Sequence, residues 1–358
     1  MSGQSTPPVT DITVESTEHL KGIALLLLMW HHLFGVGFLE DWLSPFKDIE
    51  YVTGSSAKIC LAIFLFCSGY GLYRSYINRN SKDRLYVPKK IIGALVPYWI
   101  IMLIAIAVLA FLGKFDLVYI PANILAWIHD DNILYVSFSW YIKLYVLLLL
   151  VLPAVKLIEK KWKKNLFLDG LFYIVIPFLI YYVCRSYLDE EHFTSLPASI
   201  LSSVLFVVFW FPLFAAGMIF AKYNIYTRIR DFMKRFLGWV VITLSLLVLG
   251  SIFFLRYNFY YYCIADVIYA PVFISACLLI MDNLKFRSRY VLPYLGKKSV
   301  YYWLLSGMFF LNTAELLPLI TWPQIPVFIL LWTLVLLTPF VFATDWVSGR
   351  ILKLIIRK

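Results

Sequence analysis

Long apolar segments recur along this chain and are separated by short connections rich in charged and turn-forming residues. Several of these segments reach the roughly 20 residues that an α-helix needs to cross a lipid bilayer. The alternation of apolar runs and breaks predicts ten spans, at approximately 20–39, 57–77, 91–112, 137–155, 166–187, 199–221, 236–256, 259–281, 299–319 and 323–347. The pattern therefore predicts an all-α fold, a polytopic membrane helical bundle.

The basic residues give an independent test of these spans, because Lys and Arg accumulate in the cytoplasmic connections of membrane proteins. Most of the 32 Lys and Arg residues lie in alternate connections, at 74–90, 156–164, 222–235, 285–298 and in the C-terminal tail. The intervening connections carry few cations and most of the acids. This asymmetry predicts ten helices with both termini cytoplasmic.

Composition supports the same class of protein. Hydrophobic residues make up 62% of the chain and charged residues 15%, with a mean hydropathy of +0.80, which is too apolar for a soluble fold. The net charge of +11 fits orientation and attraction to membrane lipids, or binding of a polyanionic cytosolic ligand. No soluble basic domain is available for nucleic acid. We expect a disordered start, residues 1–15, followed by one transmembrane domain, residues 16–358.

Lys21 and His32 lie at the two ends of the first apolar run. If the run is helical, His32 lies roughly 16 Å deeper along the helix axis than Lys21. The cation would then mark the membrane surface, and the imidazole would lie within the bilayer. Ionisable groups at that depth are costly, so His32 is either a functional residue or a histidine that bonds a neighbouring helix.

The cysteines and histidines do not predict a metal site. The five cysteines fall in or beside apolar spans without paired metal-ligand spacing. The five histidines are scattered, apart from the doublet at His31 and His32. We therefore expect the cysteines to be small buried hydrophobic side chains, and we expect no metal site.

Five short motifs follow one another along nearly the whole chain. They are Lys21 and His32 with ten residues between them, Phe64-Leu65-Phe66-Cys67-Ser68-Gly69-Tyr70, Lys89-Lys90 followed by Leu95-Val96-Pro97-Tyr98, Ser139-Trp140-Tyr141-Ile142, and Leu295-Gly296-Lys297-Lys298-Ser299 before a late helix. Through the order and spacing of these motifs the chain resembles the membrane O-acyltransferases of the acyltransferase-3 family.

The resemblance implies acyl transfer in a bacterial cytoplasmic membrane. The donor would be cytosolic acetyl-coenzyme A, and the acceptor a hydroxyl of a cell-envelope, exported or lipid-linked glycan. His32 would be the catalytic general base, because imidazole titrates close to neutral pH. A covalent acyl-histidine is the variant mechanism. A homo-oligomer or a separate partner transferase fits the resemblance equally.

Coenzyme A carries phosphates, so its binding site needs cations. Lys21, Lys89 and Lys90 would surround a phosphate at the inner surface, with Arg74 as a weaker candidate. For Lys89 and Lys90, a role in orienting the protein in the membrane competes with this interpretation.

Five further residues are candidates for contact with the substrates. Ser68 and Tyr70 are candidate donors to the oxyanion that develops on the thioester carbonyl. Trp140 and Tyr141 would stack on sugar rings or belong to the aromatic belt at the membrane interface. Asp266 would orient an imidazole, bind a sugar, cap a helix end or form a hydrogen bond between helices.

Two positions depart from the family pattern. Gly93 stands where many relatives have an Arg, and Ser306 stands where many have a His.

A second class of function also fits buried ionisable residues in a helical bundle. The alternative protein is a transporter or flippase of a lipid-linked saccharide, with His32 and Asp266 lining the pathway.

Overall fold

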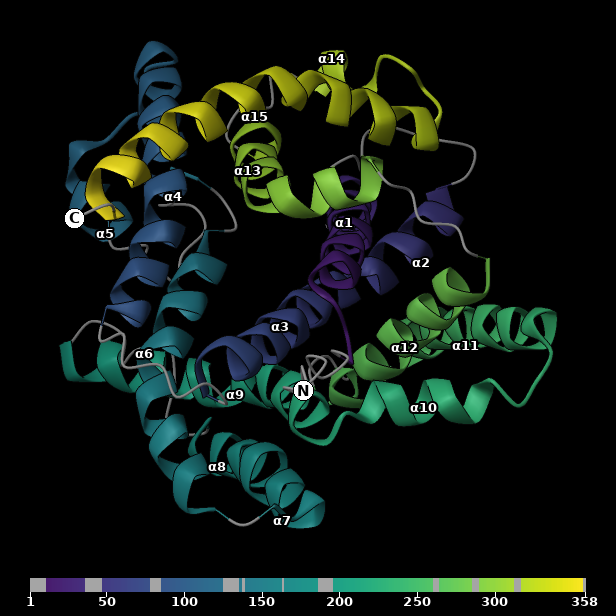
Figure 1. Cartoon of the computed structure of the whole chain (residues 1–358). Coiled ribbons are helices and arrows are strands. Elements are labelled where there is room, and N and C mark those ends of the chain that lie inside the picture. Colours follow the sequence, from purple (N-terminus) through teal and green to yellow (C-terminus); the bar gives the residue numbers. More distant parts are fainter. Residues whose placement is uncertain are drawn as a thin grey trace, which may run out of the picture.

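The computed structural model describes residues 11–35, 47–77, 85–124, 135–136, 139–162, 164–185, 196–259, 264–284, 290–311 and 317–356. All regular elements in these ranges are helices (Figure 1). The predicted all-α fold is confirmed.

The helices of the first half are α1 (Val14–Trp30), η1 (His31–Gly35), α2 (Lys47–Ala57), α3 (Ile59–Leu72), η2 (Tyr73–Ile77), α4 (Tyr86–Phe111), η3 (Leu117–Tyr119), α5 (Ile120–Ile124) and α6 (Trp140–Lys161). The helices of the second half are α7 (Leu166–Gly170), η4 (Leu171–Val175), α8 (Ile176–Cys184), α9 (Leu196–Tyr223), α10 (Ile225–Met233), α11 (Gly238–Asn258), α12 (Asp266–Leu284), α13 (Val291–Leu311), α14 (Leu317–Thr321) and α15 (Pro326–Ile356).

Eight helical segments of the described chain are long and apolar enough to cross a membrane. They correspond to α2 with α3 and η2, to α4, to α6, to α7 with η4 and α8, and to α9, α11, α12 and α15. The other two predicted spans overlap α1 with η1, and α13, which are also helical. The chain is therefore a polytopic helical membrane protein.

The start of α13 differs from the sequence prediction. The helix begins at Val291, so Leu295 to Ser299 lie inside it instead of preceding it. The helix includes the charged Lys297 and Lys298 because both lysines form ion pairs. Lys297 pairs with Glu18 at 3.4 Å, and Lys298 pairs with Asp345 at 2.6 Å.

Close helix contacts place α1 and α3 at the centre of the bundle. Gly22 of α1 and Gly296 of α13 face one another's helices, and Gly69 of α3 and Gly217 of α9 do the same. A Cβ at any of these four positions would collide with a backbone carbonyl of the facing helix. Small residues of this kind allow membrane helices to approach closely. The core site described below is built around α1 and α3.

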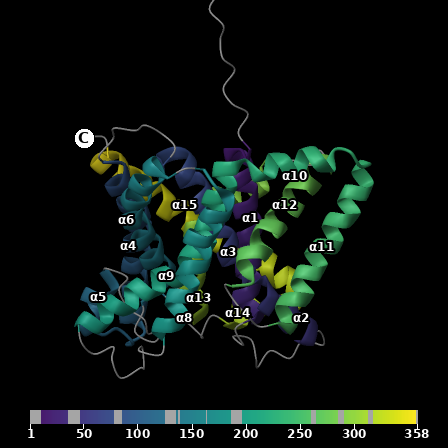
Figure 2. The same ribbon diagram turned by 90° about the horizontal axis from the view of Figure 1, so that it is seen from below.

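The start of α1 and the end of α15 lie at the same edge of the bundle, whereas α2, α5 and α14 lie at the opposite edge (Figure 2). Of the predicted disordered start, residues 1–10 lie outside the described chain. Asp11 and Ile12 are buried, and the Tyr70 hydroxyl accepts a hydrogen bond from the Ile12 amide at 2.8 Å.

Candidate active site

His32 lies where α1 changes into the π-helical turn η1. Such π-turns occur frequently at functional sites. Gly35 of η1 and Gly54 of α2 are in direct backbone contact, and a Cβ on either would clash with the other. His31 Nδ1 also lies 2.9 Å from the Gly54 carbonyl oxygen. The two glycines therefore let α2 approach the histidine doublet and hold its first imidazole.

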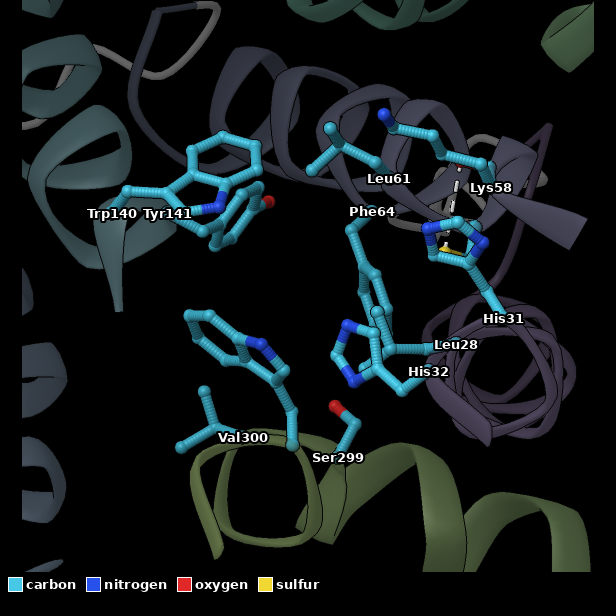
Figure 3. A pocket seen from close by; sticks show the side chains of 12 residues that line it. Leu28, His31, His32, Lys58, Leu61, Phe64, Trp140, Tyr141, Ser299 and Val300 are labelled. Carbon is cyan, nitrogen blue, oxygen red and sulfur yellow. Dashed lines mark hydrogen bonds between the residues drawn. The ribbon is translucent and has the colours of Figure 1, made fainter. Parts of the chain in front are cut away.

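The imidazole of His32 is buried and lines a cavity of about 280 Å³, which we call the histidine cavity (Figure 3). Four helical segments supply its walls, from the end of α1, the α2–α3 junction, the start of α6 and the middle of α13. Its lining residues are Leu28, His31, His32, Lys58, Cys60, Leu61, Phe64, Trp140, Tyr141, Ser299, Val300 and Trp303.

Aromatic rings form the wall opposite the histidines (Figure 3). The Tyr141 and Trp303 rings meet edge to face with centroids 5.4 Å apart. Trp140 stacks on Trp210 of α9, with centroids 5.7 Å apart, which fixes its orientation. The cavity thus combines a buried imidazole with broad aromatic faces.

A second cavity, of about 700 Å³, lies beside Lys21 and is called the basic cavity. Four lysines, from α1, α4 and α13, line it together with Tyr, Ser and apolar side chains. Its lining residues are Lys21, Phe64, Ser68, Tyr86, Lys89, Lys90, Gly93, Ala94, Pro97, Tyr141, Ile142, Tyr145, Lys297, Ser299, Val300, Tyr301 and Ile356. Clustered ammonium groups of this kind attract phosphates.

The two cavities adjoin one another. Phe64, Tyr141, Ser299 and Val300 line both. Lys21 lines only the basic cavity and His32 only the histidine cavity, eleven residues further along the same helical run. A molecule whose phosphates bind in the basic cavity could therefore extend past these four side chains into the histidine cavity.

Most of the residues singled out from the sequence line these cavities. His32, Trp140 and Tyr141 line the histidine cavity, and Lys21, Ser68, Lys89 and Lys90 line the basic cavity, which Tyr141 also borders. Helices that are far apart in the sequence bring them together.

Two predicted residues, Arg74 and Tyr70, lie outside the lining of both cavities. The Arg74 guanidinium donates a hydrogen bond to Asn224 and lies over the Tyr70 ring, 5.6 Å from its centroid. The Tyr70 hydroxyl faces Ile12, as described above. These groups join α3 to the N-terminal segment and to the end of α9.

Asp266 also lies outside both cavities and forms a buried ion pair with Arg256 of α11. Arg256 Nε donates to the Ser56 carbonyl at 2.9 Å, and the Ser56 hydroxyl donates to the Phe253 carbonyl at 2.9 Å. The ion pair therefore ties α11 and α12 to the end of α2, close to the residues that contact His31.

Sequence reasoning did not single out Lys58, Trp303 or Lys297 as site residues. Lys58 lines the histidine cavity from the α2–α3 junction, and its signal in the sequence is a cation at the edge of the predicted span 57–77. Trp303 and Lys297 come from α13, six residues apart. The sequence places Lys297 before the predicted span 299–319, so it does not predict that the two residues share a helix.

The two departures from the family pattern have clear places in the structure. Gly93 lines the basic cavity, and nothing lies within 4 Å of a Cβ added there. The Ser306 hydroxyl is buried and donates to the Trp303 carbonyl at 2.7 Å, so it acts within α13. Among the described residues, His, Cys, Asp and Glu form no group of three or more that could hold a metal ion.

The membrane helices, the buried histidine and the adjoining basic cavity define a polytopic membrane protein with two neighbouring internal cavities, one of them lined by four lysines. The family model described as an acyltransferase domain matches residues 14–344. The chain therefore belongs to the acyltransferase-3 family, and it is a membrane acyltransferase that uses an acyl donor and an acceptor. Comparisons with curated proteins and with solved structures found no match.

Proposed function

We propose that this protein transfers an acetyl group from cytosolic acetyl-coenzyme A to a hydroxyl of a cell-envelope or exported glycan in a bacterial cytoplasmic membrane. The observation that carries the proposal is the junction of the two cavities through Phe64, Tyr141, Ser299 and Val300. The phosphates of the donor lie in the basic cavity, and the thioester reaches towards His32.

The donor is held by lysines at its phosphate end and by contacts with the shared side chains at its narrow end. Lys21, Lys89 and Lys90 neutralise its phosphates, together with Lys297. The narrow part of the donor extends between the side chains that both cavities share. This arrangement gives the four lysines a role beyond the orientation of the chain in the membrane.

His32 acts as the general base. It removes the proton of the acceptor hydroxyl, whose oxygen attacks the thioester carbonyl carbon, and the developing oxyanion accepts hydrogen bonds from nearby donors. Collapse of the tetrahedral intermediate breaks the carbon–sulfur bond. The leaving thiolate takes the proton from the imidazolium, so the ester and the free thiol of coenzyme A are the products.

Ser68 is the better supported of the two predicted oxyanion donors. It lines the basic cavity next to the shared side chains, whereas the Tyr70 hydroxyl faces Ile12. Trp140 and Trp303 line the histidine cavity and offer ring faces to a sugar. The acceptor therefore approaches the imidazole from the aromatic side.

The test of this proposal is transfer of labelled acetyl from acetyl-coenzyme A into envelope glycans. Membranes containing the wild-type chain or His32→Gln are compared at matched levels of folded protein. We expect the substitution to lower transfer by roughly two orders of magnitude or more, which is the usual contribution of a general base. Equal incorporation by both proteins would remove His32 from the mechanism.

His19→Gln is the matched control. His19 is buried on the same helix, its Nδ1 lies 2.8 Å from the Glu15 carbonyl oxygen, and it lines neither cavity. It should keep transfer near the wild-type level. Loss of transfer in both variants, with loss of folded protein, would assign His32 a structural role.

The transporter alternative has less support in the geometry. It requires His32 and Asp266 along one pathway, but Asp266 is paired with Arg256 and lines neither cavity. Absence of acetyl transfer by the wild-type chain, with suitable acceptors present, would favour that alternative.

A further inference from the structure

The short helix α10 runs along one boundary of the bundle instead of through it (Figure 2). Asn224 ends α9 in the left-handed conformation, with φ of 51°, and so turns the chain. α10 then links the membrane spans α9 and α11. It lies at the edge that carries the start of α1 and the end of α15 (Figure 2).

The inner face of α10 is fixed to the rest of the protein. The buried Tyr226 donates to Asp282 Oδ2 of α12 at 2.8 Å. Thr227 donates through its hydroxyl to Asp11 Oδ1 at 2.6 Å. These bonds leave the opposite face of α10 outward and hold the helix over α12.

A groove of about 200 Å³ lies beneath α10. Ile229 and Met233 of α10 form its upper end, and Leu244 of α11 and Val272 of α12 are on its walls. Leu244 is 46% exposed and Val272 41% exposed, so the groove opens on the outer surface of the bundle. Because α11 and α12 cross the membrane, this opening faces lipid.

The groove descends into the hydrocarbon region. Leu244 lies six residues after the start of α11, and Val272 lies twelve residues before the end of α12. At ~1.5 Å per residue, these positions are about 9 Å and 18 Å from the boundary where α10 lies. An acyl chain that begins at the boundary would pass along the groove.

Exposed cations on α10 and directly after it supply the complementary charge for a lipid phosphate. Arg228 of α10 is exposed, and so are Lys234 and Arg235, which follow the last residue of the helix, Met233. The acidic residue of this helix, Asp231, already pairs with Lys234 at 2.9 Å. Arginine and lysine at the membrane boundary attract anionic lipid headgroups.

From the groove and the cations above it, we propose that α10 and the groove beneath it bind an anionic phospholipid. Arg228 and Arg235 contact the phosphate, and one acyl chain lies along Leu244 and Val272. The site is separate from the two cavities of the proposed acyl transfer and does not depend on that reaction. Its occupant holds α10 against the membrane surface.

The experiment measures retained lipid by native mass spectrometry of the full-length chain. The protein is equilibrated with phosphatidylglycerol or with phosphatidylcholine of the same acyl chains. We expect preferential retention of phosphatidylglycerol, and a loss of about tenfold in that preference in Arg228→Gln/Arg235→Gln. The matched control is Lys160→Gln/Lys161→Gln, which removes two exposed cations at the end of α6 and should keep the preference.

The acyl chain is tested separately by filling the groove. Val272→Trp, and Leu244→Trp on the opposite wall in case the first variant does not fold, should lower retention of phosphatidylglycerol. Soluble glycerol phosphate should not displace the lipid. Three outcomes would each overturn the proposal. They are unchanged retention of phosphatidylglycerol in every folded groove variant, an equal loss of lipid preference in the two double cation variants, and displacement of the lipid by glycerol phosphate.

Discussion

A buried imidazole in a membrane helix requires an explanation at the level of single residues, because ionisable groups are rare there. His32 has His31 beside it, with ring centroids 5.8 Å apart, and His31 is held by the Gly54 carbonyl. Both imidazoles line the histidine cavity from η1, and the first also contacts α2 through Gly54. The doublet combines one positioning residue with one candidate base.

Phe64 lines both cavities, so in the proposed reaction it should protect the thioester from water. In Phe64→Ala we expect a several-fold rise in hydrolysis of acetyl-coenzyme A without acceptor, because the shorter side chain opens the passage. Free thiol release from acetyl-coenzyme A measures this side reaction. Transfer to the acceptor should fall at the same time.

The matched control for this prediction is Phe254→Ala, which removes an exposed phenylalanine from α11, away from both cavities. It should leave hydrolysis unchanged. A Phe64→Ala protein that folds and hydrolyses the donor no faster than wild type would show that Phe64 does not close the passage.

At the scale of helices, the spans could be predicted because hydropathy and length decide whether a segment crosses the membrane. The start of α13 could not, since Lys297 and Lys298 resemble a loop until their partners Glu18 and Asp345 are known. The ion pair of Asp266 with Arg256 could not be predicted either, because it too depends on how the helices pack. Arg256 lies near the end of the preceding span and carries no sequence signal of its own.

The pair Arg256–Asp266 predicts a stability effect that distinguishes a structural carboxylate from one in a pathway. Removing one member leaves the other charge buried, at a cost of about 3–5 kcal/mol. Asp266→Asn should therefore lower the thermal unfolding temperature in detergent, and Arg256→Met/Asp266→Leu should recover much of the loss.

Asp231→Asn is the control for this prediction, because Asp231 is exposed and its pairing with Lys234 contributes little. Its unfolding temperature should match that of wild type. If Asp266→Asn were as stable as wild type and yet inactive, Asp266 would have a functional role instead.

At the scale of the whole molecule, the site forms only when α1, α3, α4, α6 and α13 pack together. The motifs identified His32, Lys21 and Lys89 from the sequence, because the family resemblance fixed their order. No local pattern could show that Phe64 and Tyr141 border both cavities. That relation depends on helix packing, which glycines such as Gly22 and Gly69 allow.

The final prediction concerns the orientation of the whole bundle, which decides on which side the donor must enter. The basic connections predict that the edge holding the start of α1 and the end of α15, together with the end of α6, is cytoplasmic. Lys160→Cys should then react with a membrane-impermeant thiol reagent only after permeabilisation, and Leu117→Cys should react in intact cells. Both substitutions are made with Cys184→Ser and Cys263→Ser, because the other native cysteines are buried. The reverse labelling pattern would place the basic cavity on the outside and exclude a cytosolic coenzyme A donor.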